Sequence, residues 1–596
     1  MNTAGDPSPT SLMAKLINRF SPISPRSELA AALAACRGAL VAVGLFSGMS
    51  NVLMLTGAMF MLEVYDRVLP SRSVPTLIVL FALAAGLFAA QGVIDLIRSR
   101  ILVRIGASLD EALSARVYDA VVRLSLIAGD RGDGVQPLRD LDNVRGFLSG
   151  VGPVALFDLP WIPAYLVICF LLHPYIGWAA LAGAAVLCCL TLLTEYFTRA
   201  PTKLAGDLAK TRMGLAEAGR RNAEALVAMG MAGQFGARWS DINRTYAESA
   251  RRASDVGGSL GSIAKVLRLM LQSGVLGVGA WLVIHQEATA GIIIAGSIVS
   301  ARALAPIDLA IANWKGFVAA RHSWQRLAKL LALVPAAPAP MPLGAPRSSL
   351  AVENASVVPP GGNKFVVQDV TLALEAGQGL GIIGPTASGK SSLVRMIVGV
   401  WPAARGVVRL DGAALAQWAP SALGVHIGYL PQSVALFSGT IAQNISRFDG
   451  AAAPDVIIAA AKAAGVHHLI VNLPDGYETE IGEHGVTLSA GQAQRIALAR
   501  ALYRDPFLVV LDEPNASLDA EGDEALTRAI LGVRSRGGIV VVVAHRPSAL
   551  AGVDLVLVMN RGRVQRLGPK DDVLAETLVR SAPGARPLKV VGEPGG

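Results

Sequence analysis

Six long apolar runs in the first half of this sequence constrain its fold more than any other feature. Each is close to the roughly 20 residues that an α-helix needs to cross the hydrocarbon core of a bilayer. Only 16% of the chain is charged, against about 25% in soluble globular proteins. We therefore expect a six-helix membrane domain solvated by lipid. The runs cover about residues 39–62, 74–97, 151–172, 174–194, 260–284 and 288–310.

The positive charge of the chain is concentrated in its apolar half. The net charge is +9, and residues 1–345 hold 31 Lys and Arg against 22 Asp and Glu, whereas residues 346–596 hold 22 of each. A basic excess between apolar runs is typical of the cytoplasmic loops of membrane proteins rather than of a nucleic-acid-binding surface. We expect the lipid bilayer as a partner and no nucleic acid.

The basic residues also predict an orientation. Residues 98–150 carry eight Arg and residues 195–259 carry ten Lys or Arg, whereas the short connections near Pro174 and Gln286 carry none. We therefore expect the N-terminus and both long loops in the cytoplasm. The loops mix apolar and charged residues with helical periodicity, which indicates membrane helices that continue into the cytoplasm. Separately folded cytoplasmic inserts are the alternative.

Three charged residues lie in or beside the apolar runs, namely Asp158, Arg302 and Asp308. A charge inside a membrane is costly and tends to face a cavity, so these residues could line a passage for cargo. Alternatively, the third and sixth helices extend into the cytoplasm, where the charges lie in water or pair structurally.

Composition divides the chain into five parts. A Pro- and Ala-rich stretch, "PAAPAPMPLGAP", separates the membrane domain from alternating strand-like and helical patterns that are typical of an α/β domain. The predicted parts are a cytoplasmic segment at 1–37, the transmembrane domain at 38–330, a linker at 331–346, an α/β domain at 347–575 and a tail at 576–596.

A glycine-rich loop in the α/β domain has the spacing of a phosphate-binding motif. In "GLGIIGPTASGKSSLVRMIVG" an apolar strand precedes Gly384 and a helical pattern follows Ser391, as GxxxxGKS requires. Backbone N–H groups would wrap the phosphates, Lys390 would meet the β- and γ-phosphates, and Ser391 would bind Mg²⁺. The predicted nucleotide-binding residues of this loop are Gly384, Pro385, Thr386, Ala387, Ser388, Gly389, Lys390, Ser391 and Ser392.

A second motif supplies two carboxylates. The apolar run of "FLVVLDEP" ends in Asp512 and Glu513. A buried strand that delivers an acid at its C-terminal end is the expected metal-binding partner of the phosphate loop, so Asp512 would hold Mg²⁺. Glu513 would polarise the attacking water as general base. A strand-end acid pair without a catalytic role is the alternative.

The segment "LSAGQAQRIALARAL" resembles the signature of ATP-binding cassette (ABC) ATPases, usually LSGGQ, with Ala490 in the place of the second glycine. Further motifs of that family follow its usual order. Gln432 in "YLPQ" matches the Q-loop, "SLD" ending at Asp519 matches the D-loop, and His545 in "VVVAHRP" matches the switch histidine. With six spans upstream, the resemblance covers nearly the whole chain.

This resemblance implies a fold and a mode of action. The fold is an α/β P-loop domain with an antiparallel β subdomain and a helical signature subdomain, fused to the all-α six-helix domain. Two copies would pair head to tail, as a homodimer of half-transporters that hydrolyses ATP. Each ATP would lie between one copy's phosphate loop and the other copy's Ser489, Ala490, Gly491 and Gln492.

The family also implies roles for the remaining motif residues. Gln432 would contact Mg²⁺ and the attacking water, and His545 would hold the γ-phosphate, so these two join Glu513 as catalytic residues. Asp519 would connect the two ATP sites. The metal would be held by Ser391, Gln432 and Asp512.

Narrower features resemble the PrtD-type permease/ATPase subgroup of type I protein secretion. They are the segments 61–77, 141–166, 300–327 and "VVPPGG" at 357–362. The resemblance implies export of unfolded protein with an uncleaved C-terminal signal from the bacterial inner membrane. A periplasmic adaptor (membrane fusion) protein and an outer-membrane channel would be its partners. Export of lipids, peptides or drug-like molecules is the alternative, and the six apolar runs argue against a soluble ABC ATPase.

The sequence departs from the family at the adenine. The family usually stacks an aromatic side chain on that base, about 25 residues before the phosphate loop. Here Pro359 or Val358 occupies the corresponding position, and Phe365 is the nearby aromatic residue. We therefore assign no residue to adenine stacking and expect a weaker or merely apolar contact with the base.

Overall fold

The computed structural model describes residues 28–128, 134–335, 343–482, 488–544 and 547–580. The chain forms two compact units. One comprises residues 1–121 and 133–334, and the other comprises residues 335–596 together with 122–132. Each unit is described by itself below.

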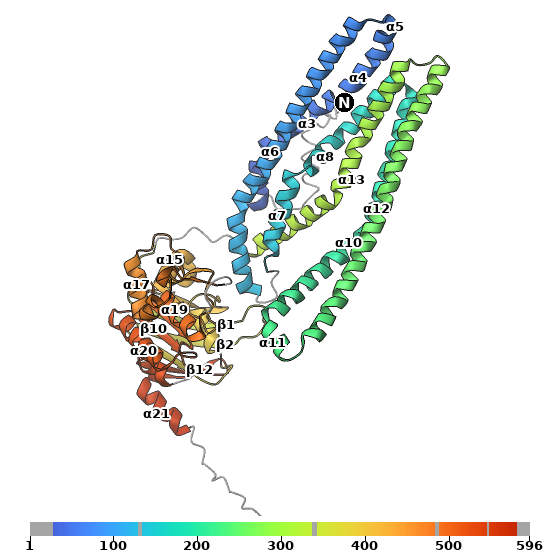
Figure 1. Cartoon of the computed structure of the whole chain (residues 1–596). Coiled ribbons are helices and arrows are strands. Elements are labelled where there is room, and N and C mark those ends of the chain that lie inside the picture. The colour runs from blue at the N-terminus through green and yellow to red at the C-terminus, as the bar shows by residue number, and fades with distance from the viewer. Residues whose placement is uncertain (1–27, 129–133, 336–342, 483–487, 545–546, 581–596) are drawn as a thin grey trace, which may run out of the picture. The chain divides into compact units, whose positions relative to one another are not determined.

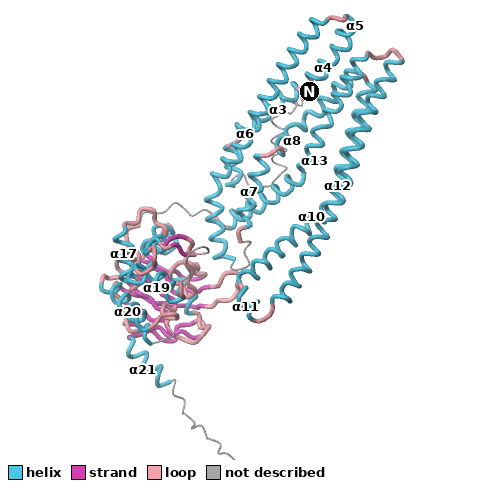
Figure 2. Tube along the Cα trace, in the orientation of Figure 1, coloured by secondary structure: helices cyan, strands magenta, loops and turns pink. Residues whose placement is uncertain are grey.

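Residues 28–333 of the described chain are almost entirely helical (Figures 1 and 2). Six helical segments are long and apolar enough to cross a membrane, which confirms the six-span prediction. The elements are α2 (Glu28–Ala35), α3 (Arg37–Leu53), α4 (Thr56–Glu63), the π-helical turn η1 (Val64–Val68), α5 (Leu69–Ser71), α6 (Val74–Ala128), α7 (Gln136–Ser149), α8 (Gly152–Asp158), the 3-10 turn η3 (Leu159–Trp161), α9 (Ile162–Leu172), α10 (Pro174–Arg221), α11 (Ala223–Ala228), α12 (Ala232–Ile284) and α13 (Ala290–Leu333).

Several of these helices are far longer than a bilayer is thick. The helix α6 has 55 residues and α12 has 53, so each extends about 80 Å at the usual rise of 1.5 Å per residue. The helices α10 and α12 pack side by side and are joined by the short α11 (Figure 1). The predicted helical extensions are therefore confirmed, and the alternative of separately folded inserts is wrong.

The third span is interrupted where prolines require it. The helix α8 ends at Asp158, the 3-10 turn η3 contains Pro160, and α9 carries Pro163 in its first turn. Proline has no N–H to donate and its ring opposes a continuous α-helical ladder, but it is tolerated at the start of a helix. The prolines thus divide this span into short helices and place Asp158 at a junction.

Asp158 lies in a buried polar network that joins α3, α6, α8 and α9. Its side chain is 6% exposed and that of Arg98 is 9% exposed. Asn51 Nδ2 donates to Asp158 Oδ1 at 2.8 Å, and Arg98 Nη1 lies 3.4 Å from the same oxygen and 3.1 Å from Ser47 Oγ. Tyr165 Oη donates to Asn51 Oδ1 at 2.9 Å. The structure thus favours structural pairing of Asp158 over exposure to a passage.

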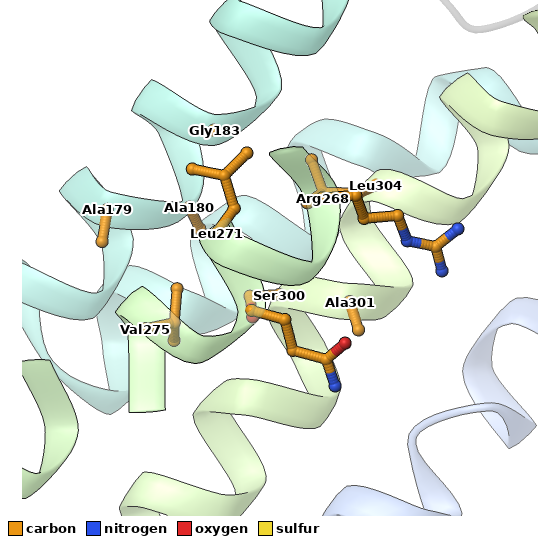
Figure 3. A pocket seen from close by; sticks show the side chains of 10 residues that line it. Ala179, Ala180, Gly183, Arg268, Leu271, Val275, Ser300, Ala301 and Leu304 are labelled. Atoms are coloured by element: carbon orange, nitrogen blue, oxygen red, sulfur yellow. The ribbon is translucent and has the colours of Figure 1, made fainter. Parts of the chain in front are cut away.

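The other two charged residues of the apolar runs, Asp308 and Arg302, have different surroundings. Asp308 on α13 forms an ion pair with Arg268 on α12. Arg302 is exposed, with its Nη1 atom 4.0 Å from Met54 Sδ. Arg268 also borders a small pocket between α10, α12 and α13, and Figure 3 shows its guanidinium extending away from Ala179 and Ala180. The lining residues are Ala179, Ala180, Gly183, Arg268, Leu271, Gln272, Val275, Ser300, Ala301 and Leu304.

The second unit is built on a six-stranded sheet in the order β12-β11-β3-β10-β9-β6. The five strands β11, β3, β10, β9 and β6 run parallel to one another. The edge strand β12 pairs antiparallel with β11. Both β9 and β10 are buried throughout, as is typical of strands covered on both faces. The strands are β3 (Gly379–Ile383), β6 (Ile427–Leu430), β9 (Leu508–Asp512), β10 (Ile539–Val543), β11 (Leu555–Asn560) and β12 (Arg563–Pro569).

A second, antiparallel sheet has the order β2-β1-β4-β5, and α14 (Lys390–Ile397) shares a hydrophobic core with both sheets. A helical cluster around α19 forms the other core of this unit. These features confirm the predicted antiparallel and helical subdomains. The strands are β1 (Ser349–Val357), β2 (Val367–Glu375), β4 (Arg405–Leu410) and β5 (Ala413–Ala414), with β7 (Gly439–Thr440) and β8 (Glu480–Ile481) as a separate pair.

The second unit also contains several short helices and 3-10 turns besides α14. They are η4 (Leu415–Gln417), α15 (Pro420–His426), α16 (Ile441–Ile445), α17 (Pro454–Ala463), α18 (His467–Val471), η5 (Gly476–Glu478), α19 (Ala490–Leu502), α20 (Ala520–Ser535), η6 (Pro547–Leu550) and α21 (Lys570–Arg580). The predicted domain limits at residues 330 and 575 fall inside α13 and α21. The helix α13 ends at Leu333, shortly before Pro335, because the residue preceding a proline disfavours the helical conformation.

The buried network around Asp158 yields a test of the membrane unit. Asp158→Asn should destabilise it by about 3 kcal/mol, because the change leaves the buried Arg98 guanidinium without one of its counter-charges. Arg98→Met added to Asp158→Asn should recover part of that loss, since the double change removes both charges. Melting temperatures in detergent would measure both effects. Additive losses in the double variant would contradict the pairing.

Candidate functional site

The glycine-rich loop between β3 and α14 is shaped by two close backbone approaches. Gly384 has φ 150° and Gly389 has φ 99°, which both favour glycine. A Cβ atom on Gly384 would lie 2.2 Å from the Met559 carbonyl oxygen, and one on Gly389 would lie 2.8 Å from the Val366 carbonyl oxygen. The loop therefore admits no side chain at these positions, and it delivers the chain directly to the first turn of α14.

Lys390 places a positive charge inside this loop. Its Nζ atom donates to the carbonyl oxygens of Gly384 at 2.8 Å and Pro385 at 2.9 Å. Only 5% of the residue is exposed. Burial lowers the pKa of the Lys390 ammonium, and the nearby carboxylates of Glu513 and Asp512 oppose that shift. An enclosed cation at the start of a helix suits a phosphate group.

Ser391 and Asp512 meet although 121 residues separate them. Ser391 Oγ donates to Asp512 Oδ1 at 3.2 Å, and Asp512 is 1% exposed. In the part of the chain that the structure describes, Asp512 Oδ2 has no hydrogen-bond partner. Burial raises the pKa of Asp512, and Glu513 adds to the shift. A hydroxyl oxygen and a free carboxylate oxygen at a phosphate loop are the donors that Mg²⁺ prefers, so the residues fit this ion.

Glu513 follows at the C-terminal end of β9 in a strained conformation. Its φ is 53°, which non-glycine residues adopt at a cost and which is concentrated at functional sites. Its N–H donates to the Val543 carbonyl oxygen at 3.0 Å, which anchors it to the end of β10. The phosphate loop, Asp512 and Glu513 thus lie at the C-terminal ends of the parallel strands, where such sheets bind ligands.

The signature segment forms the start of α19. Ser489 caps this helix, with its Oγ accepting from the Gln492 N–H at 3.3 Å, while Gln492 Oε1 accepts from the Ser489 N–H at 2.9 Å. This reciprocal capping box explains both residue types. Ser489 and Ala490 are exposed. A Cβ atom on Gly491 would lie 2.7 Å from the Ser517 carbonyl oxygen, so only glycine fits there.

Asp519 forms the start of α20 and connects it to α19. Its Oδ1 atom accepts from the Gly522 N–H at 2.9 Å, and its carboxylate pairs with Arg495. The Gly522 N–H and the Arg495 guanidinium hold the pKa of Asp519 below its usual range. The predicted D-loop thus contacts the signature helix within one chain.

For the remaining predicted site residues, the structure gives fewer contacts with the phosphate loop and the two carboxylates. Gln432 is exposed and follows β6, whose Leu430 pairs with Leu511, so it lies at the same sheet edge as Asp512. His545 lies outside the described residues. At the expected adenine position, Pro359 belongs to a turn closed by the Gly362 N–H. Phe365 is partly exposed, with the Arg405 guanidinium 5.2 Å from its ring centroid.

Gln494 is a residue of this region that sequence reasoning missed. It is 5% exposed, and its amide contacts the backbone between Glu513 and Ser517. The signal was available, because Gln494 shares a helical face with the buried Ala497, Leu498 and Ala501. A buried amide needs hydrogen-bond partners, so its place on an apolar face indicates a specific contact.

The close approach at Gly491 gives a stability prediction. Gly491→Ala should lower the free energy of unfolding by about 1–3 kcal/mol, because the methyl group meets a fixed carbonyl oxygen. Gly532→Ala on α20 is the matched control, since open space surrounds its Cβ position and alanine favours a helix by about 1 kcal/mol over glycine. Denaturant or thermal unfolding would measure both. Equal effects of the two changes would contradict the contact with Ser517.

Comparisons with known proteins match this architecture. The family model described as ABC transporter matches residues 367–516, and the one described as ABC transporter transmembrane region matches residues 40–304. A solved bacterial Atm1-family ABC exporter with ATP bound has the same fold, with a TM-score of 0.76 at 23% identity over 93% of this chain and 99% of that one.

Two curated relatives are similar along most of the chain. The cyclolysin secretion/processing ATP-binding protein CyaB of Bordetella pertussis is 29% identical over 87% of this chain and 73% of its own length. The type I secretion system ATP-binding protein PrsD of Rhizobium meliloti is 58% identical over 95% of this chain and 98% of its own length. The chain therefore belongs to the ABC transporters, and within them to the family of type I secretion ATP-binding proteins that includes PrsD.

Proposed function

We propose that this chain is the ATP-driven exporter of a type I secretion pathway. It moves unfolded protein with an uncleaved C-terminal signal out of the cytoplasm. The observation that carries the proposal is the 58% identity to a type I secretion protein over 95% of the chain. That match includes the membrane domain, through which cargo must pass.

The rival candidate is export of a lipid, a peptide or a drug-like molecule. The nucleotide-binding motifs do not discriminate between these cargoes, because every ABC exporter carries them. Three relatives that match along most of the chain are named for type I secretion, for cyclolysin secretion and for translocation of the toxin RTX-I. Protein cargo is therefore the better supported function.

The proposed assembly is a homodimer in the bacterial inner membrane. The basic residues of 98–150 and 195–259 support an orientation with the N-terminus and the nucleotide-binding domain in the cytoplasm. A periplasmic adaptor (membrane fusion) protein and an outer-membrane channel complete the route to the exterior. The motifs support this assembly because one chain holds one phosphate loop and one signature segment.

Each ATP site draws on both copies. In one copy, Lys390 and the N–H groups of the loop from Gly384 to Ser392 bind the phosphates. Ser391, Asp512 and Gln432 would hold Mg²⁺, which neutralises phosphate charge when bound. The signature of the other copy contributes Ser489, Ala490, Gly491 and Gln492, whose capped helix start suits the γ-phosphate.

Glu513 acts as general base on the attacking water, and His545 and Gln432 orient the γ-phosphate and the water. Asp519 connects the two sites through α19 and α20. Binding of two ATP molecules favours the closed pair and so turns the membrane helices, because a ligand shifts a two-state equilibrium by its difference in affinity. Hydrolysis removes the γ-phosphate and reopens the pair.

Glu513→Gln should still bind ATP but should hydrolyse it about a hundredfold more slowly or worse, because the amide cannot accept the proton of water. The closed pair should accumulate with ATP enclosed. Turnover of purified protein and retention of labelled ATP after rapid removal of free nucleotide measure the two effects.

Lys390→Ala serves as the contrasting variant, because it should lose turnover through weaker phosphate contacts and should not retain ATP. Near-normal hydrolysis by Glu513→Gln would mean that another residue positions the water.

The cargo is tested in cells. Deletion of the gene should remove a specific protein from the culture medium, and a heterologous unfolded protein that carries the last part of that cargo should be secreted by the wild-type chain. Secretion should stop with Glu513→Gln at unchanged membrane levels. Comparison of secreted proteins by mass spectrometry is the measurement. An unchanged set of secreted proteins with altered lipids would favour the rival candidate.

A further inference from the structure

Gln494 is a buried side chain that binds the backbone on both sides of a single turn. Its Nε2 atom donates to the carbonyl oxygens of Pro514 at 2.5 Å and Glu513 at 3.3 Å, and its Oε1 atom accepts from the Ser517 N–H at 3.0 Å. The side chain is 5% exposed, so water competes little for these groups. One amide therefore fixes the segment from Glu513 to Ser517, which we call the 513–517 turn.

The turn begins at a strained residue. Glu513 has φ 53°, and such a conformation persists only where the surrounding structure holds it. Its N–H donates to the Val543 carbonyl oxygen at 3.0 Å, and its carbonyl oxygen accepts from the Ala516 N–H at 3.3 Å as well as from Gln494. These bonds fix the peptide groups on both sides of Glu513 and therefore the direction in which its carboxylate leaves the backbone.

The same glutamine lies on the helix that begins with the signature. It is in the second turn of α19, five residues after the capping Ser489. The carbonyl oxygen of Ser517 lies so close to Gly491 that a Cβ atom there would be only 2.7 Å away. Arg495 and Asp519 add an ion pair between α19 and the segment after the turn. The start of α19 and the 513–517 turn therefore pack as one body.

We propose that Gln494 is a positioning residue for ATP hydrolysis, which holds the Glu513 carboxylate toward the attacking water and couples it rigidly to the signature helix. In the proposed dimer, Glu513 serves the ATP of its own copy and the signature serves the ATP of the other. Gln494 is thus a link between the two sites. The inference rests on the proposed roles of Glu513 and of the signature.

The chemistry of the contact explains why the residue is a glutamine. The site needs N–H donors for two carbonyl oxygens and one acceptor for an N–H, and the glutamine amide supplies all three. Glutamate at this position would retain the acceptor and lose the donors toward Glu513 and Pro514. Methionine would lose every hydrogen bond of the amide. Because it retains the length and volume of the glutamine side chain, it would leave no cavity.

The test compares Gln494→Met and Gln494→Glu with wild type in the full-length dimer in detergent. Both variants should lower kcat for ATP hydrolysis about tenfold or more and should leave KM for ATP within about threefold. Both should also retain labelled ATP after rapid removal of free nucleotide, because binding and closure persist while the chemical step is slow. A general weakening of the fold would not produce such retention.

Gln378→Met is the matched control. Gln378 is half-buried, and its Oε1 atom accepts from the Glu375 N–H at 2.9 Å, outside the ATP site. This variant should hydrolyse ATP like wild type and should retain none.

Three results would overturn the proposal. Wild-type kcat in Gln494→Met would show that the hydrogen bonds of the Gln494 amide do not position Glu513. Slow turnover without ATP retention would assign Gln494 to dimer closure. A lowered melting temperature that accompanies lost activity in both variants would make its role purely structural. Failure of the proposed function is distinct, because it would appear in wild type as absent hydrolysis or in Glu513→Gln as normal hydrolysis.

Discussion

The arrangement of the nucleotide-binding unit depends on a few charges that the sheet edge holds in a small volume. Lys390, Asp512 and Glu513 meet where β3 and β9 end, and Lys390 and Asp512 are almost fully buried. Burial disfavours each charge alone, so the arrangement is stable only with partners of opposite sign. The unpartnered Asp512 Oδ2, within the described residues, and the enclosed ammonium are therefore complementary to a metal cation and a phosphate respectively. Two glycines without room for a Cβ atom allow the backbone to approach this centre.

The membrane unit obeys a related constraint. Backbone groups in lipid must be satisfied within the protein, so the chain crosses as helices, and a break in a helix occurs only where the surrounding protein accommodates it. Polar side chains inside this unit form their own network, as Asp158, Arg98 and Asn51 show. The network joins short pieces of the third span to the first two spans. The prolines that interrupt the span thereby lie beside a buried polar attachment of that span to α3 and α6.

Much of this architecture could be predicted from the sequence because the signals are local. The six spans follow from the length of the apolar runs, and the phosphate loop follows from the spacing of Gly384, Gly389 and Lys390. The pairing of Ser391 with Asp512 could be expected only because the motif implies a partner acid. The pairing of Asp158 with Arg98 could not be predicted. The two residues are 60 positions apart, and only the packing of the helices determines which distant charges come close together. The position of Gln494 on the apolar face of α19 was a usable signal for a buried contact, but its partners could not be predicted because they are backbone groups.

The contact of Gly491 with Ser517 shows why the two ATP sites of a dimer need not be independent. A helix start that has no room for a methyl group cannot move relative to the turn that follows Glu513 without separating from it. In the proposed dimer, a displacement of the signature by the γ-phosphate of one site would therefore be transmitted to the turn that carries Glu513, the proposed general base of the other site. Close packing makes such a body rigid rather than deformable. In the proposed dimer, coupling between the sites would thus follow from a steric contact and from one buried amide, without any additional moving element.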